Sequence, residues 1–318
     1  MTDSVSSVRW CAISATVGAI CAAILGAGCA TPAATGSPPV PSIQIDDVNR
    51  FYRVYEDADG RPTADELQHD YLDPGSDGLH RFAKARNISG TTIADAMLRH
   101  PEIYSGAKRC MVVLPQVRER LVVALGKLFR LDPEARNAPV TIGVGRGRPV
   151  AIGSPDGGVQ VGLEALCATN WLNLNVEDRF VHVIAHEYAH VQQAQVLTDD
   201  QNPTVLERSL VEGIAEFTAE LISGEVAYSQ FAASTKGHER EIESAFVADE
   251  DKTDLSDWID NSTPEKPRDL GYWVGYRITK SYYQNATDKR QAVREILEMT
   301  NPKALLANSG WYPGIQLR

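Results

Sequence analysis

A metal-binding pattern lies in the middle of this chain of 318 residues, within the segment from Val181 to Gln195. Residues 186–190 read HEYAH, so two histidines stand four positions apart with a glutamate directly after the first. On a helix such positions share one face, and the imidazoles of His186 and His190 can bind one metal ion. Glu187 lies at the edge of that face, where it can take a proton from water. The pattern predicts a zinc site with hydrolytic chemistry.

The segment also has the periodicity of an amphipathic helix. Val181, Ile184, Tyr188 and Val191 form an apolar stripe roughly opposite the two histidines, and no Pro or Gly interrupts it. One face can therefore pack on a core while the other lines a cleft. The alternative is a core helix whose histidines are solvated or internally paired. His182 lies one turn before the pattern, and we expect it to pack against or support the site rather than bind the metal.

A second helix is predicted after a short polar loop over residues 197–203. Thr204 and Glu207 form a capping box, in which each residue bonds the other's backbone N–H group. Gly224 is a natural residue for the end of the helix. The short loop makes the two predicted helices run roughly antiparallel, which brings the second helix back towards the histidines.

Two glutamates on this second helix are candidates for a third metal ligand. A catalytic zinc ion has three protein ligands and one open position. Glu212 and Glu216 are four residues apart, so both can face the metal. One can bind it while the other accepts the N–H of a ligand imidazole. A glycine such as Gly213 destabilises a helix interior, and a close approach of two helices at this point would explain its presence. For Glu212 and Glu216, the alternative to a metal-site role is a pair of glutamates on a solvated helix face.

The two motifs together resemble a known group of proteins. HEYAH followed by EGIAEF is similar to the gluzincin clan of metallopeptidases, in which a glutamate from a second helix completes the site. More closely, the chain resembles a bacterial family of predicted zinc-dependent proteases, related to a gliding-motility lipoprotein. Weaker similarities run over most of the chain after the N-terminal segment, including IDDVNRFYRVYEDA, YLDPGSDGL and GYWVGYRITKSYY.

This resemblance implies a zincin-like fold, proteolysis and zinc as the cofactor. It implies that Glu212 is the third ligand and that Glu216 orients a ligand histidine. It further implies that the strand before the metal-binding helix, residues 159–164, is the sheet edge to which a peptide substrate adds as an extended strand. It does not imply a known substrate.

A protease of this type also needs a hydrogen-bond donor for the oxyanion that develops on the scissile carbonyl. Residues 270–283 have helical spacing, and Tyr272 and Tyr276 share one face of that helix. These two tyrosines and His238 are our candidates. For each tyrosine, simple packing in the core is the alternative.

The N-terminal segment has the features of an export signal. After Arg9 an apolar run covers residues 10–28 and ends in small residues before Cys29. We expect residues 1–28 to be a signal segment, Cys29 to carry a lipid and residues 29–42, rich in Pro, Ser and Ala, to be a tether. An uncleaved membrane anchor and simple secretion are the alternatives. Each of them places the catalytic part outside the cytoplasm, in the periplasm of the cell envelope.

Composition and strand-like patterns give the rest of the expected architecture. A net charge of −11 argues against nucleic acid as a partner. Residues 43–131 are mainly helical in pattern, and residues 139–164 contain two or three short strands. We therefore expect an α+β fold, mostly helical with a small mixed sheet and an active-site helix pair, as one zincin-like domain over residues 43–318. Cys110 and Cys167 remain in the exported part, and the sequence leaves open whether they pair.

Taken together, these features predict an exported, lipid-anchored zinc-dependent peptide hydrolase that acts on a peptide or protein. A non-catalytic lipoprotein that keeps the fold as a scaffold is one alternative. A zinc hydrolase of a non-peptide amide is another. The sequence gives no indication of the oligomeric state.

The anchor generates the first testable prediction. Cys29→Ser should abolish metabolic labelling of the protein with a radioactive or clickable fatty acid, because the acylated thiol is lost. Labelling that persists in the variant, or wild-type protein without lipid, would show that Cys29 is not an anchor.

Overall fold

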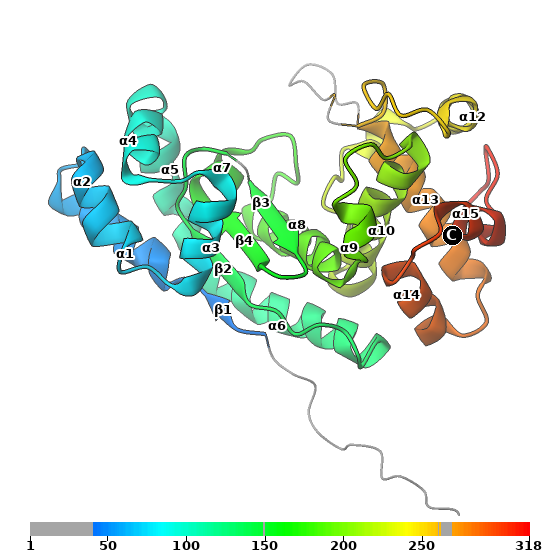
Figure 1. Ribbon diagram of the computed structural model, residues 1–318, viewed down its shortest axis with the longest axis horizontal. Helices are drawn as coiled ribbons and strands as arrows, with labels where there is room; N and C mark the ends of the chain where they lie inside the picture. Colours follow the sequence, from blue (N-terminus) through cyan, green and yellow to red (C-terminus); the bar gives the residue numbers. More distant parts are fainter. Residues whose placement is uncertain (1–40, 149, 260, 262–268) are drawn as a thin grey trace, which may run out of the picture. The chain divides into compact units, whose positions relative to one another are not determined.

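The computed structural model in Figure 1 describes residues 41–318, apart from 149, 260 and 262–268. The expected signal segment, Cys29 and nearly all of the expected tether lie outside the described residues. None of the helices in the described part is long and apolar enough to cross a lipid bilayer.

The first part of the described chain is almost entirely helical, as predicted for residues 43–131. Its helices are α1 (Asp46–Asp57), α2 (Ala64–Glu66), the π-helical turn η1 (Leu67–Leu72), α3 (Asp77–Arg86), α4 (Gly90–Arg99), α5 (Pro101–Met111) and α6 (Leu114–Leu131). The chain starts with a two-residue strand, β1 (Ile43–Gln44), which the sequence pattern did not indicate. So short a strand has no alternation to recognise and exists only through its partner.

Four strands form a small mixed sheet in the order β1-β2-β4-β3, where β2 is Val140–Gly143, β3 is Ala151–Ser154 and β4 is Gly158–Gly162. β2 pairs in parallel with β1 and β4, whereas β3 is antiparallel to β4. The fold is therefore α+β with a mixed sheet, as predicted.

The edge strand, however, is β3 and not residues 159–164. β4 lies between β2 and β3, and residues 163–164 already belong to the next helix. The physical reason is burial: every residue of β4 is buried, whereas β3 is mostly half-buried. The valine-rich strand takes the interior position, and the turn before Gly158 folds the smaller, less apolar strand back along its outer side.

The remaining helices follow the sheet in the chain. They are α7 (Leu163–Ala168), α8 (Val176–Gln192), α9 (Gln195–Thr198), α10 (Val205–Ser223), α11 (Phe231–Ser234), α12 (Glu239–Asp249), α13 (Leu270–Asn285), α14 (Lys289–Leu297) and α15 (Pro302–Ser309). The predicted capping box of Thr204 and Glu207 starts α10, and Gly224 ends it in the left-handed conformation with φ of 103°. Both helices that carry the candidate metal ligands are therefore present, although α8 begins before Val181 and ends at Gln192 rather than Gln195.

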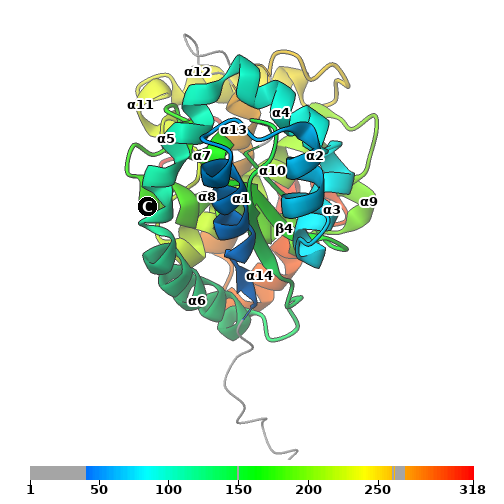
Figure 2. The same cartoon turned by 90° about the vertical axis from the view of Figure 1, so that its left-hand side faces the viewer.

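Helices α3 and α8 cover opposite faces of the sheet (Figure 2). A Cβ on Gly78 of α3 would meet the side chain of Thr141, and a Cβ on Gly153 would meet the backbone of Glu187 in α8. Gly153 is paired with Val159, which is paired with Val140, so it lies on the face opposite Thr141. The metal-binding helix thus rests directly on the edge strand.

A disulfide and a buried arginine hold the chain that leads into α8. Cys110 of α5 and Cys167 of α7 are bonded, with their Cα atoms 6.0 Å apart, which answers the question that the sequence left open. Arg179 of α8 donates hydrogen bonds to the carbonyl groups of Leu166 and Cys167. The start of α8 is therefore tied to α7, and through the disulfide to α5.

Gly213 marks a close helix approach, as its place in the sequence indicates, but its partner is α13 and not α8. A Cβ on Gly213 would lie 2.0 Å from the carbonyl carbon of Gly275. A Cβ on Gly275 would lie 1.8 Å from the carbonyl oxygen of Ser209. Helices α8 and α10 cannot touch so closely at the site, because their histidine and glutamate side chains fill the space between them.

This crossing gives a stability prediction. Gly213→Ala should destabilise the protein by about 1–3 kcal/mol or more, because the added methyl group overlaps a backbone that cannot move alone. Gly106→Ala is the matched control, since Gly106 lies in α5 and its Cβ would meet only the end of the Arg109 side chain, at 3.4 Å. That change should stabilise by about 0.5–1 kcal/mol. Thermal or urea unfolding measures both, and equal effects would contradict the assignment of this contact.

Candidate active site

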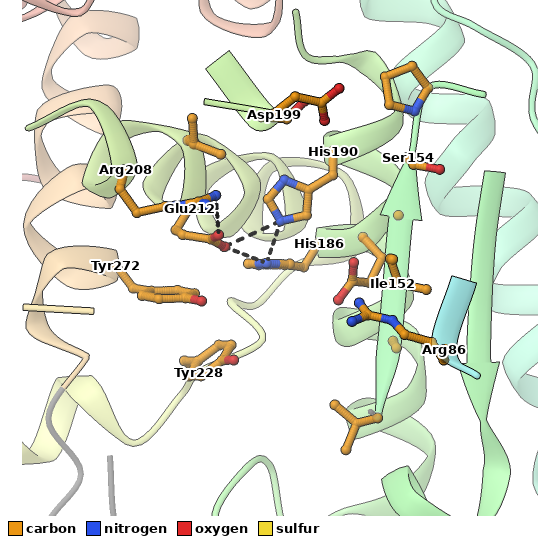
Figure 3. Close-up of a pocket in the computed structure, with 17 residues that line it drawn as sticks. Arg86, Ile152, Ser154, His186, His190, Asp199, Arg208, Glu212, Tyr228 and Tyr272 are labelled. Atoms are coloured by element: carbon orange, nitrogen blue, oxygen red, sulfur yellow. Dashed lines mark hydrogen bonds and ion pairs between the residues drawn. The ribbon is translucent and has the colours of Figure 1, made fainter. Parts of the chain in front are cut away.

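Three side chains from two helices converge on one point (Figure 3). His186 and His190 lie on one face of α8, and their Nε2 atoms are 3.1 Å apart. Oε2 of Glu212, on α10, lies 3.4 Å from Nε2 of His186 and 3.3 Å from Nε2 of His190. The structure therefore brings together the two predicted histidine ligands and Glu212, rather than Glu216, at a single site.

The outward-facing nitrogen of each histidine has its own partner. Nδ1 of His186 lies 2.6 Å from Oε1 of Glu216, whose side chain is 1% exposed. Nδ1 of His190 lies 2.7 Å from Oε1 of Gln193, and the amide nitrogen of Gln193 donates to the carbonyl of Val211. These contacts fix both rings so that Nε2 faces the shared point. Glu216 thus has the supporting position that the resemblance implies, next to a ligand imidazole.

This arrangement fits a zinc ion. Zn–N bonds of about 2.0–2.1 Å place neighbouring ligand atoms of a tetrahedron about 3.3–3.4 Å apart, close to the three distances observed. Imidazole and carboxylate donors suit zinc rather than calcium or magnesium, which prefer oxygen donors alone. Among the described residues, one group of His, Cys, Asp or Glu side chains could hold a metal ion with its ligand atoms within 4.8 Å of one another. It consists of His186, His190 and Glu212.

The charges of the site oppose the effect of burial on its histidines. Burial lowers the pKa of His186, but Glu216 and Glu212 outweigh it and raise this pKa to about 10. The pKa of His190 is also raised, because Glu212 more than offsets its burial. Burial raises the pKa of Glu212, but the two imidazoles outweigh it and hold the pKa well below its usual value. A metal ion must therefore displace protons from the histidines, and its affinity should fall as the pH falls.

The trio opens into a cavity of about 510 Å³. One wall is the edge strand β3 with its flanking residues 150–155, and the opposite wall comes from α10 and α13. Glu187 also lines this cavity beside the two histidines, as the general-base hypothesis requires. The space is large enough to hold several residues of a peptide next to the metal-binding side chains.

The tyrosine candidates separate into two places. Tyr272 lines the cavity, and its ring stacks on His186 with the ring centroids 6.3 Å apart. Tyr276 lies outside this cavity, with its hydroxyl accepting a hydrogen bond from Lys280, and lines a smaller pocket with Glu216. His238 is exposed and pairs with Glu241. In the structure Tyr276 and His238 do not line the cavity, because the helix turn that brings Tyr272 to the cavity carries Tyr276 past it.

Histidine 182 has the packing role that we expected. His182 is buried, and its Nδ1 lies 2.8 Å from the hydroxyl oxygen of Ser223 at the end of α10. It joins the two metal-binding helices one turn before His186 and does not reach the metal-binding point.

Several residues of the site were missed by sequence reasoning, among them Gln193, Tyr228, Arg86, Asp199 and Arg208. Gln193 had a local signal, since it follows His190 by three residues, although it lies just after the end of α8 in an extended conformation. Tyr228 also lines the cavity, with its ring centroid 6.0 Å from His186, but it lies in a loop without any periodic pattern. Arg86 reaches the cavity from the end of α3, 100 residues before His186 in the chain (Figure 3). Only the fold brings Tyr228 and Arg86 to the site.

Comparison with known proteins supports the same chemistry. Residues 165–305 match a family model described as "Predicted Zn-dependent protease (DUF2268)". The matched region contains α8, α10 and α13, and therefore all three candidate metal ligands, Glu187 and Tyr272. No curated protein matches the chain, and no solved structure does. The relation to gluzincins and to a gliding-motility lipoprotein stays a prediction.

The site predicts different losses for its two glutamates. Glu212→Ala should lose zinc outright, because two histidines alone do not make a catalytic zinc site. Glu216→Ala should weaken zinc binding by about 10–100-fold, because it removes the support of His186. Atomic absorption and competition with a chelating dye measure both. Glu220→Ala is the control on the next turn of α10, where Glu220 pairs with Lys280; it should bind zinc normally. If Glu216→Ala protein were metal-free and Glu212→Ala protein still bound zinc, Glu216 would be the ligand and Glu212 the supporting residue.

Proposed function

We propose that this protein is a zinc-dependent metallopeptidase that hydrolyses peptide bonds outside the cytoplasm. The observation that carries the proposal is the position of the His186, His190 and Glu212 trio. It opens into a cavity whose wall is an edge strand, with Glu187 in the same cavity. The family match supports the zinc-dependent protease chemistry. We also propose that the fold is zincin-like and that the metal site is of the gluzincin type.

His186, His190 and Glu212 would hold the zinc ion, which supplies a Lewis acid that acidifies water and polarises a carbonyl group. Glu187 accepts the proton of the attacking water and passes it to the leaving amine. Glu216 and Gln193 keep the histidine rings turned towards the cavity during this exchange. The chain's own residues thus provide the ligands, the base and the orientation of both imidazoles.

The edge strand suggests how a peptide would lie. β3 uses one side for pairing with β4, and its other side borders the cavity. An extended peptide can add to such an edge by main-chain hydrogen bonds, which are independent of side-chain identity. This mode favours peptides over small non-peptide amides, because a small amide would use little of the strand.

Tyr272 is our proposed donor to the oxyanion. It lines the cavity next to His186, and hydroxyl donors of this kind stabilise the charge that develops on the scissile carbonyl. Tyr228 is its neighbour, with ring centroids 4.9 Å apart, and burial together with the nearby Glu212 raises the pKa of Tyr228, so that Tyr228 keeps its proton.

Export and lipid anchoring remain part of the proposal. The disulfide between Cys110 and Cys167 supports an oxidising compartment, because such bonds rarely persist in a reducing cytosol. A lipid on Cys29, with residues 29–42 as a tether, would hold the catalytic part at a membrane of the cell envelope.

Replacement of the general base separates catalysis from metal binding. Glu187→Gln should keep about one zinc per chain and lower the rate of peptide cleavage by about 10²–10⁴-fold. A fluorogenic peptide library and metal analysis measure the two properties on the same preparation. Retained activity within tenfold would remove Glu187 as the base. Wild-type protein that binds zinc but cleaves no peptide would favour the scaffold or the non-peptide hydrolase.

The oxyanion role can be tested by deleting one oxygen atom. Tyr272→Phe should lower kcat by about 10²–10³-fold with little change in KM, since the hydroxyl acts in the transition state. Tyr276→Phe is the matched control one helical turn later and should leave kcat within a few-fold. A larger loss in Tyr228→Phe than in Tyr272→Phe would transfer the role to Tyr228.

A further inference from the structure

Arg86 is a cation in the cavity that the proposed mechanism does not use. It lines the cavity with the metal-binding trio and enters from the side of β3, whereas Arg208 enters from α10 (Figure 3). Nε of Arg86 is buried and lacks a hydrogen-bond partner among the residues that the structure describes. Its guanidinium group forms no ion pair within this part of the chain. A buried donor of this kind is costly unless a ligand or water satisfies it.

The other charged groups of the cavity differ from Arg86. Arg208 lies 3.9 Å from the metal-binding Glu212, so its charge is partly balanced within the protein. Glu187 and Asp199 also line the cavity, and neither forms an ion pair with Arg86 among the described residues. Of the two cavity arginines, Arg86 is therefore the one whose guanidinium group is available to bind an anionic ligand.

The backbone that carries Arg86 is well fixed. Arg86 is the last residue of α3, and Asn87 ends the helix in the left-handed conformation. The carbonyl oxygen of Arg86 accepts a hydrogen bond from Nε of Arg146. α3 itself packs on the sheet where Gly78 meets Thr141. A side chain on so fixed a base is suited to recognise a ligand at a defined distance from the metal-binding point.

A guanidinium group in such a place recognises a carboxylate. Its planar fork matches the two oxygen atoms and forms charge-assisted hydrogen bonds. A peptide can supply a carboxylate from an aspartate or glutamate side chain or from its own C-terminus.

We propose that Arg86 binds a carboxylate of the substrate, so that the enzyme selects peptides with an acidic group at one fixed position relative to the cleaved bond. This proposal rests on the proposed function, because it names the substrate class of the same site. Arg86 acts here as a specificity-determining residue and takes no part in proton transfer.

The test measures binding and does not depend on turnover. Zinc-loaded Glu187→Gln protein is titrated with fluorescein-labelled hexa-alanine peptides, each with one glutamate moved along the peptide and with a free or amidated C-terminus. Fluorescence anisotropy gives the Kd of each peptide. We expect one glutamate position, or the free C-terminus, to tighten binding by at least about tenfold over its neutral counterpart, the size of a charge-assisted contact. The amidated series tells the two carboxylate sources apart.

Substitutions in the same background assign the effect. Arg86→Gln should abolish the preference while zinc content and thermal stability stay unchanged, and Arg86→Lys should keep part of it. Arg148→Gln is the matched control, because Arg148 is exposed, lies next to the same strand and does not line the cavity. It should keep the full preference, which separates direct contact from the general field of the protein.

The outcomes test the carboxylate subsite and the peptidase function separately. No preference in the Glu187→Gln parent, or a preference that survives Arg86→Gln, would overturn the role of Arg86. Cleavage of peptides by wild type without acidic selectivity would leave the peptidase and remove the carboxylate subsite. Arg86-dependent binding of acidic peptides by a wild-type protein that cleaves none of them would support the subsite and count against the peptidase.

Discussion

The site depends on one constraint: the Nδ1 atom of each imidazole of α8 contacts a side chain of the protein, on the side of the ring away from the cavity. Glu216 lies within 2.6 Å of His186, and Gln193 holds His190, so each ring is fixed before anything enters the cavity. Glu216 is almost completely buried, and removing its partner would leave an uncompensated charge in the core. α8 and α10 therefore cannot slide past one another by a helical turn without separating this pair. The pair sets the register in which Glu212 meets the two Nε2 atoms.

Glycines set the distances around this register. Gly153 allows β3 to lie directly on α8, since a Cβ there would be 1.9 Å from the carbonyl oxygen of Glu187. On the other side, Gly213 and Gly275 allow α13 to close onto α10, and this contact carries Tyr272 to the cavity. The width of the cavity is thus determined by backbone contacts, which are less adaptable than contacts between side chains.

The parts of the site that could be predicted are those with a local physical signal. HEYAH and the pair of Glu212 and Glu216 obey helical spacing, and Thr204 and Gly224 mark the helix ends through capping chemistry. The strand order could not be predicted, because β3 and β4 are both short strands and nothing local tells which one lies outside. Here the resemblance to a family gave the wrong edge strand.

Long-range packing decides the remainder. Tyr272 and Tyr276 share a helical face, yet only Tyr272 lines the cavity, whereas Tyr276 lines the smaller pocket; Tyr228 lines both. Helical periodicity tells which residues share a face, but not how far along the helix a neighbouring loop inserts. Arg86 is a still more distant case, since its position depends on α3, the sheet and the order of its strands together.

The charges of the site explain how the same side chains can be compatible with folding and with metal binding. Glu216 and Glu212 raise the pKa of His186, and Glu212 raises that of His190, so a proton held by these rings lies beside buried carboxylates. A metal ion that takes the place of such protons would be balanced by the same carboxylates. Folding therefore does not require an unbalanced buried charge, and metal binding does not create one. Glu187 also contributes to the raised pKa of both histidines, and it lines the same cavity, where the proposed mechanism uses it as the base.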